Sequence, residues 1–214
     1  MLTIHAAPLV LPVGAAAVVD GAVAVEGDRI AAIGPYDEVA AALPGARVRR
    51  WPGVITPGLR QWHGRWLLTR VYHPDPRESD ELGTAPISGD ALESLELDEA
   101  RWAGSVRRGL QRMLAHGTTA VAGFFPDRVR PAVSRSGLVV VSPVRGPGIL
   151  LDGPNLDPFV EGFDLAGSVH APLEVGGRAD LAAFDAPDEA GLVAQGAGTC
   201  FATVLGGRLV YRRA

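Results

Sequence analysis

Two side chains that could do chemistry stand close together in the stretch GVITPGLRQWHGRW, residues 53–66. The imidazole of His63 can ligate a divalent metal or transfer a proton. Arg65 stands two residues later, where a second histidine would begin a metal site, but a guanidinium is permanently cationic and offers no lone pair. His63 and Arg65, together with Gln61 and Trp62, therefore form the candidate binding site. The sequence assigns no catalytic residue.

Three interpretations of His63 stay open. Its ring can be held by hydrogen bonds among three nearby tryptophans, Trp51, Trp62 and Trp66. It can instead line a ligand pocket in which Arg65 receives an anion. It can also be a metal ligand, although a hydrolytic zinc site needs about three protein ligands and an open position for water.

A second group of possible metal ligands follows in the segment YHPDPRESDE, residues 72–81. His73 is the only imidazole in it, and with His63 it is a candidate metal ligand. Carboxylates nearby could complete an improvised site, namely Asp75, Glu78, Asp80 and Glu81. The alternative is an ordered surface loop with no ligand.

Composition excludes several classes of function. All 20 basic residues are arginine, so mechanisms that need a lysine Schiff base or a lysine general base are excluded. The net charge of −4 gives no reason to expect nucleic acid or an anionic membrane. The single cysteine, Cys200, cannot form an intramolecular disulfide and is expected to be an inert core residue. No signal peptide or membrane-spanning run is evident, so a cytoplasmic location is expected.

The first 56 residues predict short strands separated by turns. Two apolar runs flank the turn at residues 26–29, which predicts a hairpin. Residues 36–43 predict a short helix, and residues 46–58 predict two further strands. Short strands at this spacing are typical of a small β-sandwich or barrel.

The middle of the chain has a different pattern. Between Asp98 and His116, apolar side chains recur at helical spacing, which predicts an amphipathic helix with Asp98 as N-cap and Gly117 as its stop. Residues 118–125 predict a buried strand, and residues 138–144 predict another continuous apolar strand. A helix between them, at 130–137, favours a parallel sheet.

The last part of the chain returns to β-structure. Residues 145–166 are rich in Gly, Pro and Asp and predict the least regular segment. Residues 178–185 predict a strand, and residues 199–213 predict a hairpin that turns at Gly206 and Gly207. The order is therefore β, then α/β, then β.

This order and five local strings resemble the amidohydrolase superfamily, most closely its imidazolonepropionase and cyclic-amidine deaminase branch. GVITPGLRQWHGR is similar to the family passage G-x-x-x-x-P-G-x-x-(N/D)-x-H-x-H, which leads into the first barrel strand. The four other strings follow the family's order: GAVAVEGDRIAAIGP (21–35), LAHGTTAV (114–121), GGRADLAAFD (176–185) and ATVLGGRLVY (202–211).

The resemblance implies an α+β fold in which the N- and C-terminal segments form a composite β-sandwich with an inserted (β/α) barrel. It places residues 1–58 and 167–214 in the sandwich and residues 59–166 in the insertion. The insertion has roughly 110 residues, whereas a complete barrel needs about 250, so a truncated barrel remnant is expected. In the family motif the second metal-ligating histidine falls at Arg65.

The resemblance therefore implies a degenerate, non-catalytic homologue, a pseudoenzyme that acts as a binding or accessory module without a cofactor. The alternative is a hydrolase or deaminase of carbon–nitrogen bonds in a small cyclic substrate, with zinc or iron in a rebuilt site near His63. A truncated parallel sheet leaves an apolar face and an edge uncovered. A homodimer is expected for that reason, with a small-molecule ligand and with neither nucleic acid nor membrane as partner.

Overall fold

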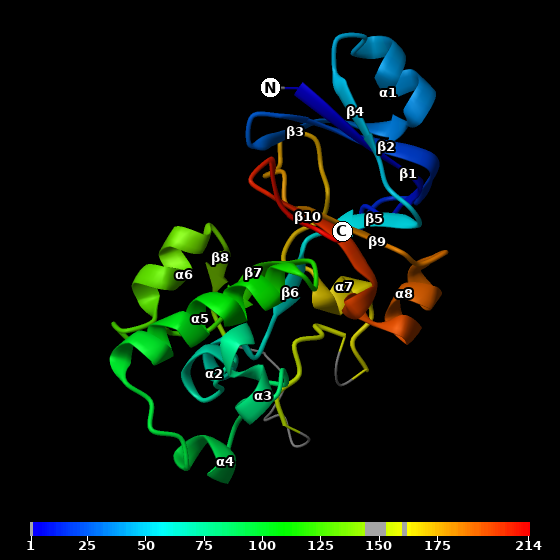
Figure 1. Ribbon diagram of the computed structural model, residues 1–214. Helices are drawn as coiled ribbons and strands as arrows, with labels where there is room; N and C mark the ends of the chain where they lie inside the picture. Colours follow the sequence, from blue (N-terminus) through cyan, green and yellow to red (C-terminus); the bar gives the residue numbers. More distant parts are fainter. Residues whose placement is uncertain (1, 144–152, 160–161) are drawn as a thin grey trace. The chain divides into compact units, whose positions relative to one another are not determined.

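The computed structural model describes residues 2–143, 153–159 and 162–214 (Figure 1). The chain forms two compact units, which are described separately. The first contains Met1–Arg60, Leu114–Thr119 and Asp157–Ala214, and the second contains Gln61–Met113 and Ala120–Leu156. Helices and a large sheet occur together, so the expected α+β class is confirmed. In the part of the chain that the structure describes, no helix is long and apolar enough to cross a membrane.

The first unit is built on an eight-stranded sheet of order β11-β10-β9-β5-β1-β2-β3, with β4 paired to β1 beside this path. Its strands come from both ends of the chain. They are β1 (Leu2–Val10), β2 (Val18–Glu26), β3 (Arg29–Pro35), β4 (Arg47–Arg50), β5 (Val54–Pro57), β9 (Leu181–Phe184), β10 (Cys200–Leu205) and β11 (Arg208–Arg212).

Three pairings give this sheet its topology. The first half of β1 pairs in parallel with β4, and its last two residues, Leu9 and Val10, pair in parallel with β5. Strand β5 then pairs antiparallel with β9, where Val54 lies opposite Phe184. The expectation that the N-terminal and C-terminal segments build one β-structure is confirmed by this pairing.

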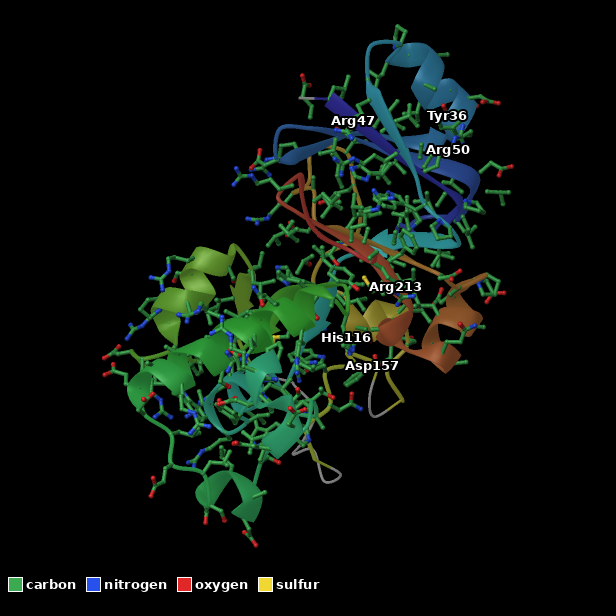
Figure 2. The ribbon with its side chains drawn as sticks, in the orientation of Figure 1. Tyr36, Arg47, Arg50, His116, Asp157 and Arg213 are labelled. Atoms are coloured by element: carbon green, nitrogen blue, oxygen red, sulfur yellow. The ribbon has the colours of Figure 1, made fainter. Side chains whose placement is uncertain are left out.

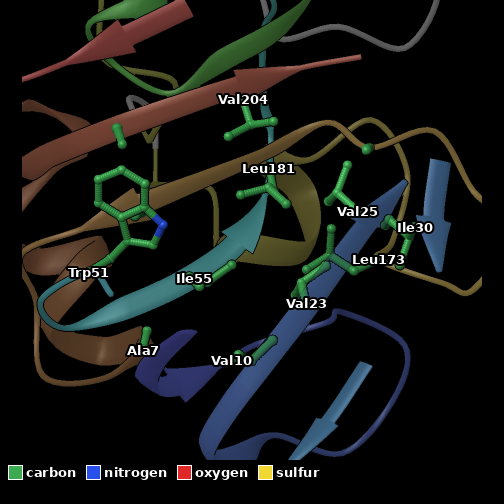
Figure 3. Close-up of a cluster of buried hydrophobic side chains, with 13 residues drawn as sticks. Ala7, Val10, Val23, Val25, Ile30, Trp51, Ile55, Leu173, Leu181 and Val204 are labelled. Carbon is green, nitrogen blue, oxygen red and sulfur yellow. The ribbon is translucent and has the colours of Figure 1, made fainter. Parts of the chain in front are cut away.

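The core of the first unit lies where the two ends of the sheet enclose small and branched side chains (Figure 3). Val23, Val25 and Ile30 on β2 and β3 belong to the same buried cluster as Leu181 and Val204 on β9 and β10. Branched side chains suit a pleated, half-buried surface, which explains why these runs form strands. Strands from both ends of the chain therefore contribute to one buried cluster.

Short helices complete the first unit. They are α1 (Tyr36–Ala42), α7 (Leu165–Ser168), α8 (Glu189–Gln195) and the 3-10 turn η3 (Ala197–Thr199). Helix α1 confirms the expected helix at 36–43 and packs its Val39 against β1 and β2. Helix α8 was not expected. Its start is fixed by Asp188, whose carboxylate accepts a hydrogen bond from the backbone N–H of Gly191.

The second unit carries the longest helix, α5 (Glu99–Leu114), which confirms the amphipathic pattern. The Asp98 carboxylate accepts a hydrogen bond of 2.7 Å from Arg101 N–H, as an N-cap does. Gly117 has a φ of +73°, which lets the chain leave the helix direction. The other helical segments are α2 (Gly64–Thr69), η1 (Pro76–Glu78), α3 (Ser79–Leu82), α4 (Asp90–Glu93) and α6 (Arg130–Ser136).

A smaller sheet has the order β6-β7-β8, formed by β6 (Leu59–Gln61), β7 (Thr118–Ala122) and β8 (Val139–Val141). Strands β7 and β8 are parallel and α6 connects them, as expected. Both are shorter than the apolar runs that predicted them. Strand β7 stops before Gly123, whose φ is +145°, and Phe124 beyond it is 70% exposed. Strand β8 is only partly covered, because Val140 is 51% exposed.

Candidate functional site

The candidate residues from the motif lie where β6 ends and α2 begins. Gln61, the last residue of β6, is fully buried, and His63, directly before α2, is only 9% exposed. The Gln61 side-chain amide donates to the Leu156 carbonyl at 3.0 Å, while its oxygen accepts from the His63 backbone N–H at 3.0 Å. Gln61 thus fixes the turn that carries His63, which is a positioning role.

Arg65 does not share the environment of His63. Its side chain is exposed on α2, and it forms no ion pair with a described residue. Its Cβ lies close to the backbone of Gly123, where an added methyl would be 2.6 Å away. Trp62 is half-buried. His63 and Arg65, the two motif residues with a possible chemical role, are therefore close in sequence but differ in exposure.

His73, the second candidate ligand, is buried against α5. Its Nε2 lies 3.0 Å from the Leu67 carbonyl, and its backbone N–H donates to Ser105 Oγ at 2.8 Å. Burial, with smaller effects of the Arg112 and Arg108 charges, lowers the pKa of His73 to about 4, although its bond to the Leu67 carbonyl acts in the opposite direction. The neutral ring donates from Nε2 to the Leu67 carbonyl, which uses the proton of the imidazole.

The carboxylates near His73 are held by arginines of α5. Glu78 Oε1 accepts from Arg101 at 2.8 Å, and Asp75 Oδ2 accepts from Arg108 Nη1 at 2.9 Å. Arg108 also donates to the His73 carbonyl at 2.8 Å. The segment that could have offered metal ligands is therefore tied to α5 by ion pairs, which fits the alternative of an ordered loop.

Glu78 is the centre of this network. Besides Arg101, it accepts hydrogen bonds from the Tyr72 hydroxyl at 2.7 Å and from the Asp75 backbone N–H at 2.8 Å. These donors, Tyr72 first and the Asp75 amide next, lower the pKa of Glu78 to about 2. Burial raises the pKa of Tyr72, as does its bond to the ionised Glu78.

The remaining acidic candidates do not complete a ligand set. Asp80 and Glu81 are exposed on α3. Among residues 2–143, 153–159 and 162–214, the structure places no group of three or more His, Cys, Asp or Glu side chains that could hold a metal ion.

Trp51 packs in the first unit against His5. Its indole N–H donates to His5 Nδ1 at 3.1 Å, and the two rings stack with centroids 5.9 Å apart. The expectation that Trp51 hydrogen-bonds to His63 is therefore wrong, because its single donor is used by His5. Burial, with a smaller effect of Arg49, lowers the pKa of His5 to about 4.

Cys200 is fully buried at the start of β10, as expected for a core residue. Burial raises the pKa of its thiol to about 11. At neutral pH it is protonated, and a thiol in that state is a poor nucleophile.

A group of arginines in the first unit was missed from the sequence. Arg47 and Arg49 on β4 and Arg212 on β11 line a cavity of about 210 Å³ with Arg50, Trp51 and Leu209. Figure 2 labels Arg47 and Arg50 with Tyr36, whose ring lies 4.0 Å below the Arg50 guanidinium. The sequence signal was the alternation of arginines in RVRR, which places Arg47 and Arg49 on one face of a strand.

One segment of the chain matches the model of a known protein family. Residues 21–46 match the imidazolonepropionase-like composite domain of bacteria. This segment contains the β2–β3 hairpin and α1, and it includes the first of the strings that resemble the superfamily. The resemblance is therefore confirmed there. No curated protein matches the chain.

Solved structures give more distant similarities. They include ochratoxinase from A. niger (22% identity, TM-score 0.45), guanine deaminase from Bradyrhizobium japonicum (23%, 0.42) and a zinc-bound adenosine deaminase from Xanthomonas campestris (20%, 0.42). They cover 66%, 66% and 65% of this chain, and 31%, 34% and 33% of their own chains. This chain thus spans about a third of their length, and TM-scores below 0.5 do not establish a shared activity.

Proposed function

We propose that this chain is an amidohydrolase-like protein with a degenerate metal site, which acts as a non-catalytic binding or accessory module. The observation that carries the proposal is the state of the motif residues. Arg65 occupies the second histidine position and is exposed, while Gln61 is engaged in structural hydrogen bonds, as is His73 outside the motif. In the same proposal, β6, β7 and β8 with their helices are the remnant of a (β/α) barrel.

The donor set does not fit a catalytic metal of the kind that the resemblance implies. His63 is the one motif position that retains a ligating side chain. Asp75 and Glu78 already compensate Arg108 and Arg101, so recruiting them to a metal would leave two partly buried guanidiniums without their carboxylate partners. We therefore derive no reaction step through a metal.

The rival function is a hydrolase or deaminase of a small cyclic carbon–nitrogen compound, with zinc or iron bound by His63 and His73. It requires His73, which is fully buried and packed against Gly109, to become accessible to a metal that His63 also binds. None of the described contacts favours this rearrangement.

Metal analysis separates the two functions. We expect the purified chain to contain zinc and iron far below one ion per chain, both as isolated and after incubation with either metal followed by desalting. His63→Ala should leave that content unchanged. A stoichiometric metal that His63→Ala and His73→Ala each remove, together with deaminase activity on cyclic amidines, would overturn the non-catalytic function.

We also propose that the chain forms a homodimer through the region of β8. Strand β8 ends the smaller sheet, and Val140 is exposed on it. An exposed strand edge with apolar side chains is a template for pairing. We expect light scattering to give twice the chain mass at micromolar concentration and Val140→Arg to shift it to the monomer. A wild-type monomer at that concentration would contradict the dimer.

We further propose a cytoplasmic location, which the single buried Cys200 supports.

A further inference from the structure

The arginine groove, lined by Arg47, Arg49, Arg212, Trp51 and Leu209, lies between β4 and β11 in the first unit. Strand β11 is the end of the large sheet, and β4 pairs with β1 beside the main path. The groove therefore has a strand on each side and the nearly buried Trp51 as part of its wall. Its volume of about 210 Å³ admits a small ligand.

Charge is concentrated in this groove without compensation. Arg49 is half-buried, and burial together with the charges of Arg47 and Arg212 lowers its pKa. Ion pairs in the described part of the chain engage other arginines, and none includes Arg47, Arg49 or Arg212. Three guanidiniums brought together in this way repel one another unless an anion lies among them.

Arg50 belongs to the wall of the groove but has a different partner. Its guanidinium lies over the Tyr36 ring on the α1 side of β4, as Figure 2 shows. Alternation along a strand explains the difference, because residues 47 and 49 face one side and residue 50 faces the other. The cationic face of the groove is thus made by Arg47, Arg49 and Arg212.

We propose that the arginine groove binds a phosphate group, either as inorganic phosphate or as the phosphate of a small monoester. The site is separate from the His63 region and does not depend on the proposed loss of catalysis. Guanidinium groups present planar forks of N–H donors that match phosphate oxygens.

A phosphate suits the groove better than a carboxylate does. One carboxylate carries a single charge, and its two oxygens are satisfied by one forked arginine. A phosphate monoester carries a charge of about −1.5 to −2 at pH 7 and has three strong acceptor oxygens. It can therefore bridge arginines from both β4 and β11.

The test is calorimetric titration of the full chain with sodium phosphate, and separately with ribose 5-phosphate, at ionic strength fixed with sodium chloride. We expect saturable binding at one site per chain. Arg49→Ala and Arg212→Ala should each weaken it by about tenfold or more, since each removes charged hydrogen bonds. Arg208→Ala is the matched control, because Arg208 is exposed on the same strand as Arg212 and does not line the groove. It should bind as the wild type does.

One further variant and one further probe keep the outcome clear. Arg49→Lys retains the charge but loses the fork, so binding should weaken even where Arg49→Ala fails to fold. Tighter binding of ribose 5-phosphate than of phosphate would support a monoester as the ligand. The proposal is overturned if neither probe saturates, or if Arg208→Ala weakens binding as much as Arg212→Ala does. It is also overturned if a single-stranded oligonucleotide binds with an affinity that rises with its length, because that is a nucleic-acid surface.

Discussion

At the scale of single residues, Glu78 connects several segments of the second unit. It joins the Tyr72 hydroxyl, the Asp75 backbone and the Arg101 guanidinium through one carboxylate. A half-buried carboxylate with several donors is held in its ionised form, and its charge then contributes to folding. The acidic segment around it therefore has a structural use that its composition alone does not reveal.

The charge of Glu78 predicts a specific pH dependence. Its pKa is about 2 in the folded chain against an ordinary value of 4.5, so its contribution is complete above pH 4.5 and is lost as the pH falls toward 2. Glu78→Gln should lower the free energy of unfolding at pH 7 by roughly 1–2 kcal/mol. The difference from the wild type should shrink below pH 4.5.

Urea unfolding at several pH values measures this difference. Glu81→Gln is the control, since Glu81 is exposed on the neighbouring helix α3. Its effect should stay within about 0.5 kcal/mol. A loss for Glu78→Gln that does not change between pH 7 and pH 3 would show that the carboxylate charge is not what stabilises the network.

At the scale of elements, the corner between β5 and β6 is fixed by close packing. A methyl group on Gly58 would overlap the side chain of Thr119, which is itself buried. Gly58→Ala should therefore destabilise the first unit by about 1–3 kcal/mol, as overpacking does. The measurement is the urea midpoint. Gly45→Ala is the control, because no atom lies within 4 Å of the added methyl. Equal midpoints for the two variants would contradict close packing at the corner.

Elements with strong local signals were predictable from sequence. Helix α5 has a helical apolar period with Asp98 as cap, and the β10–β11 hairpin has two glycines with positive φ at its turn. Helix α8 was missed because its seven residues are too few for a period, although the Asp188 cap was a usable signal. The extent of strand β8 was overestimated, because a continuous run of apolar residues does not show which of its side chains are covered.

The candidate site was predictable only in part, for a related reason. The motif identified Gln61 and His63 as neighbours at the end of a strand, and they are hydrogen-bonded there. Sequence spacing could not show that Arg101 and Arg108 engage the carboxylates near His73, because those contacts join segments far apart in the chain. The arginine groove also joins two segments that are far apart in the chain, β4 and β11. Their proximity could therefore not be predicted from the sequence.

At the scale of the whole molecule, each unit contains a buried neutral histidine. His5 in the first unit and His73 in the second have a pKa of about 4, against 6.5 in an unfolded chain. Between pH 6.5 and 4 the unfolded chain binds protons that the folded chain does not, so the stability of both units should fall as the pH falls through this window.

Tryptophan fluorescence can follow the units separately, because Trp51 lies in the first and Trp62, Trp66 and Trp102 lie in the second. Trp51→Phe reports the second unit, and a variant that keeps Trp51 alone reports the first. We expect both urea midpoints to drop between pH 7 and pH 4.5. His73→Gln should flatten the dependence of the second unit only. A flat profile for either unit would contradict the neutral state of its histidine.

The pairing of β5 with β9 also has a consequence for how the protein is made. Val54 leaves the ribosome long before its partner Phe184 does. At about 5–20 residues per second, the early strands wait on the order of ten seconds for the strands that complete their sheet. During that interval the edge of β5 is unpaired, and the apolar face that β9 and β10 later cover is exposed, so both can associate with other chains. The yield of folded protein should therefore depend on the speed of translation and on chaperones that shield a nascent sheet edge.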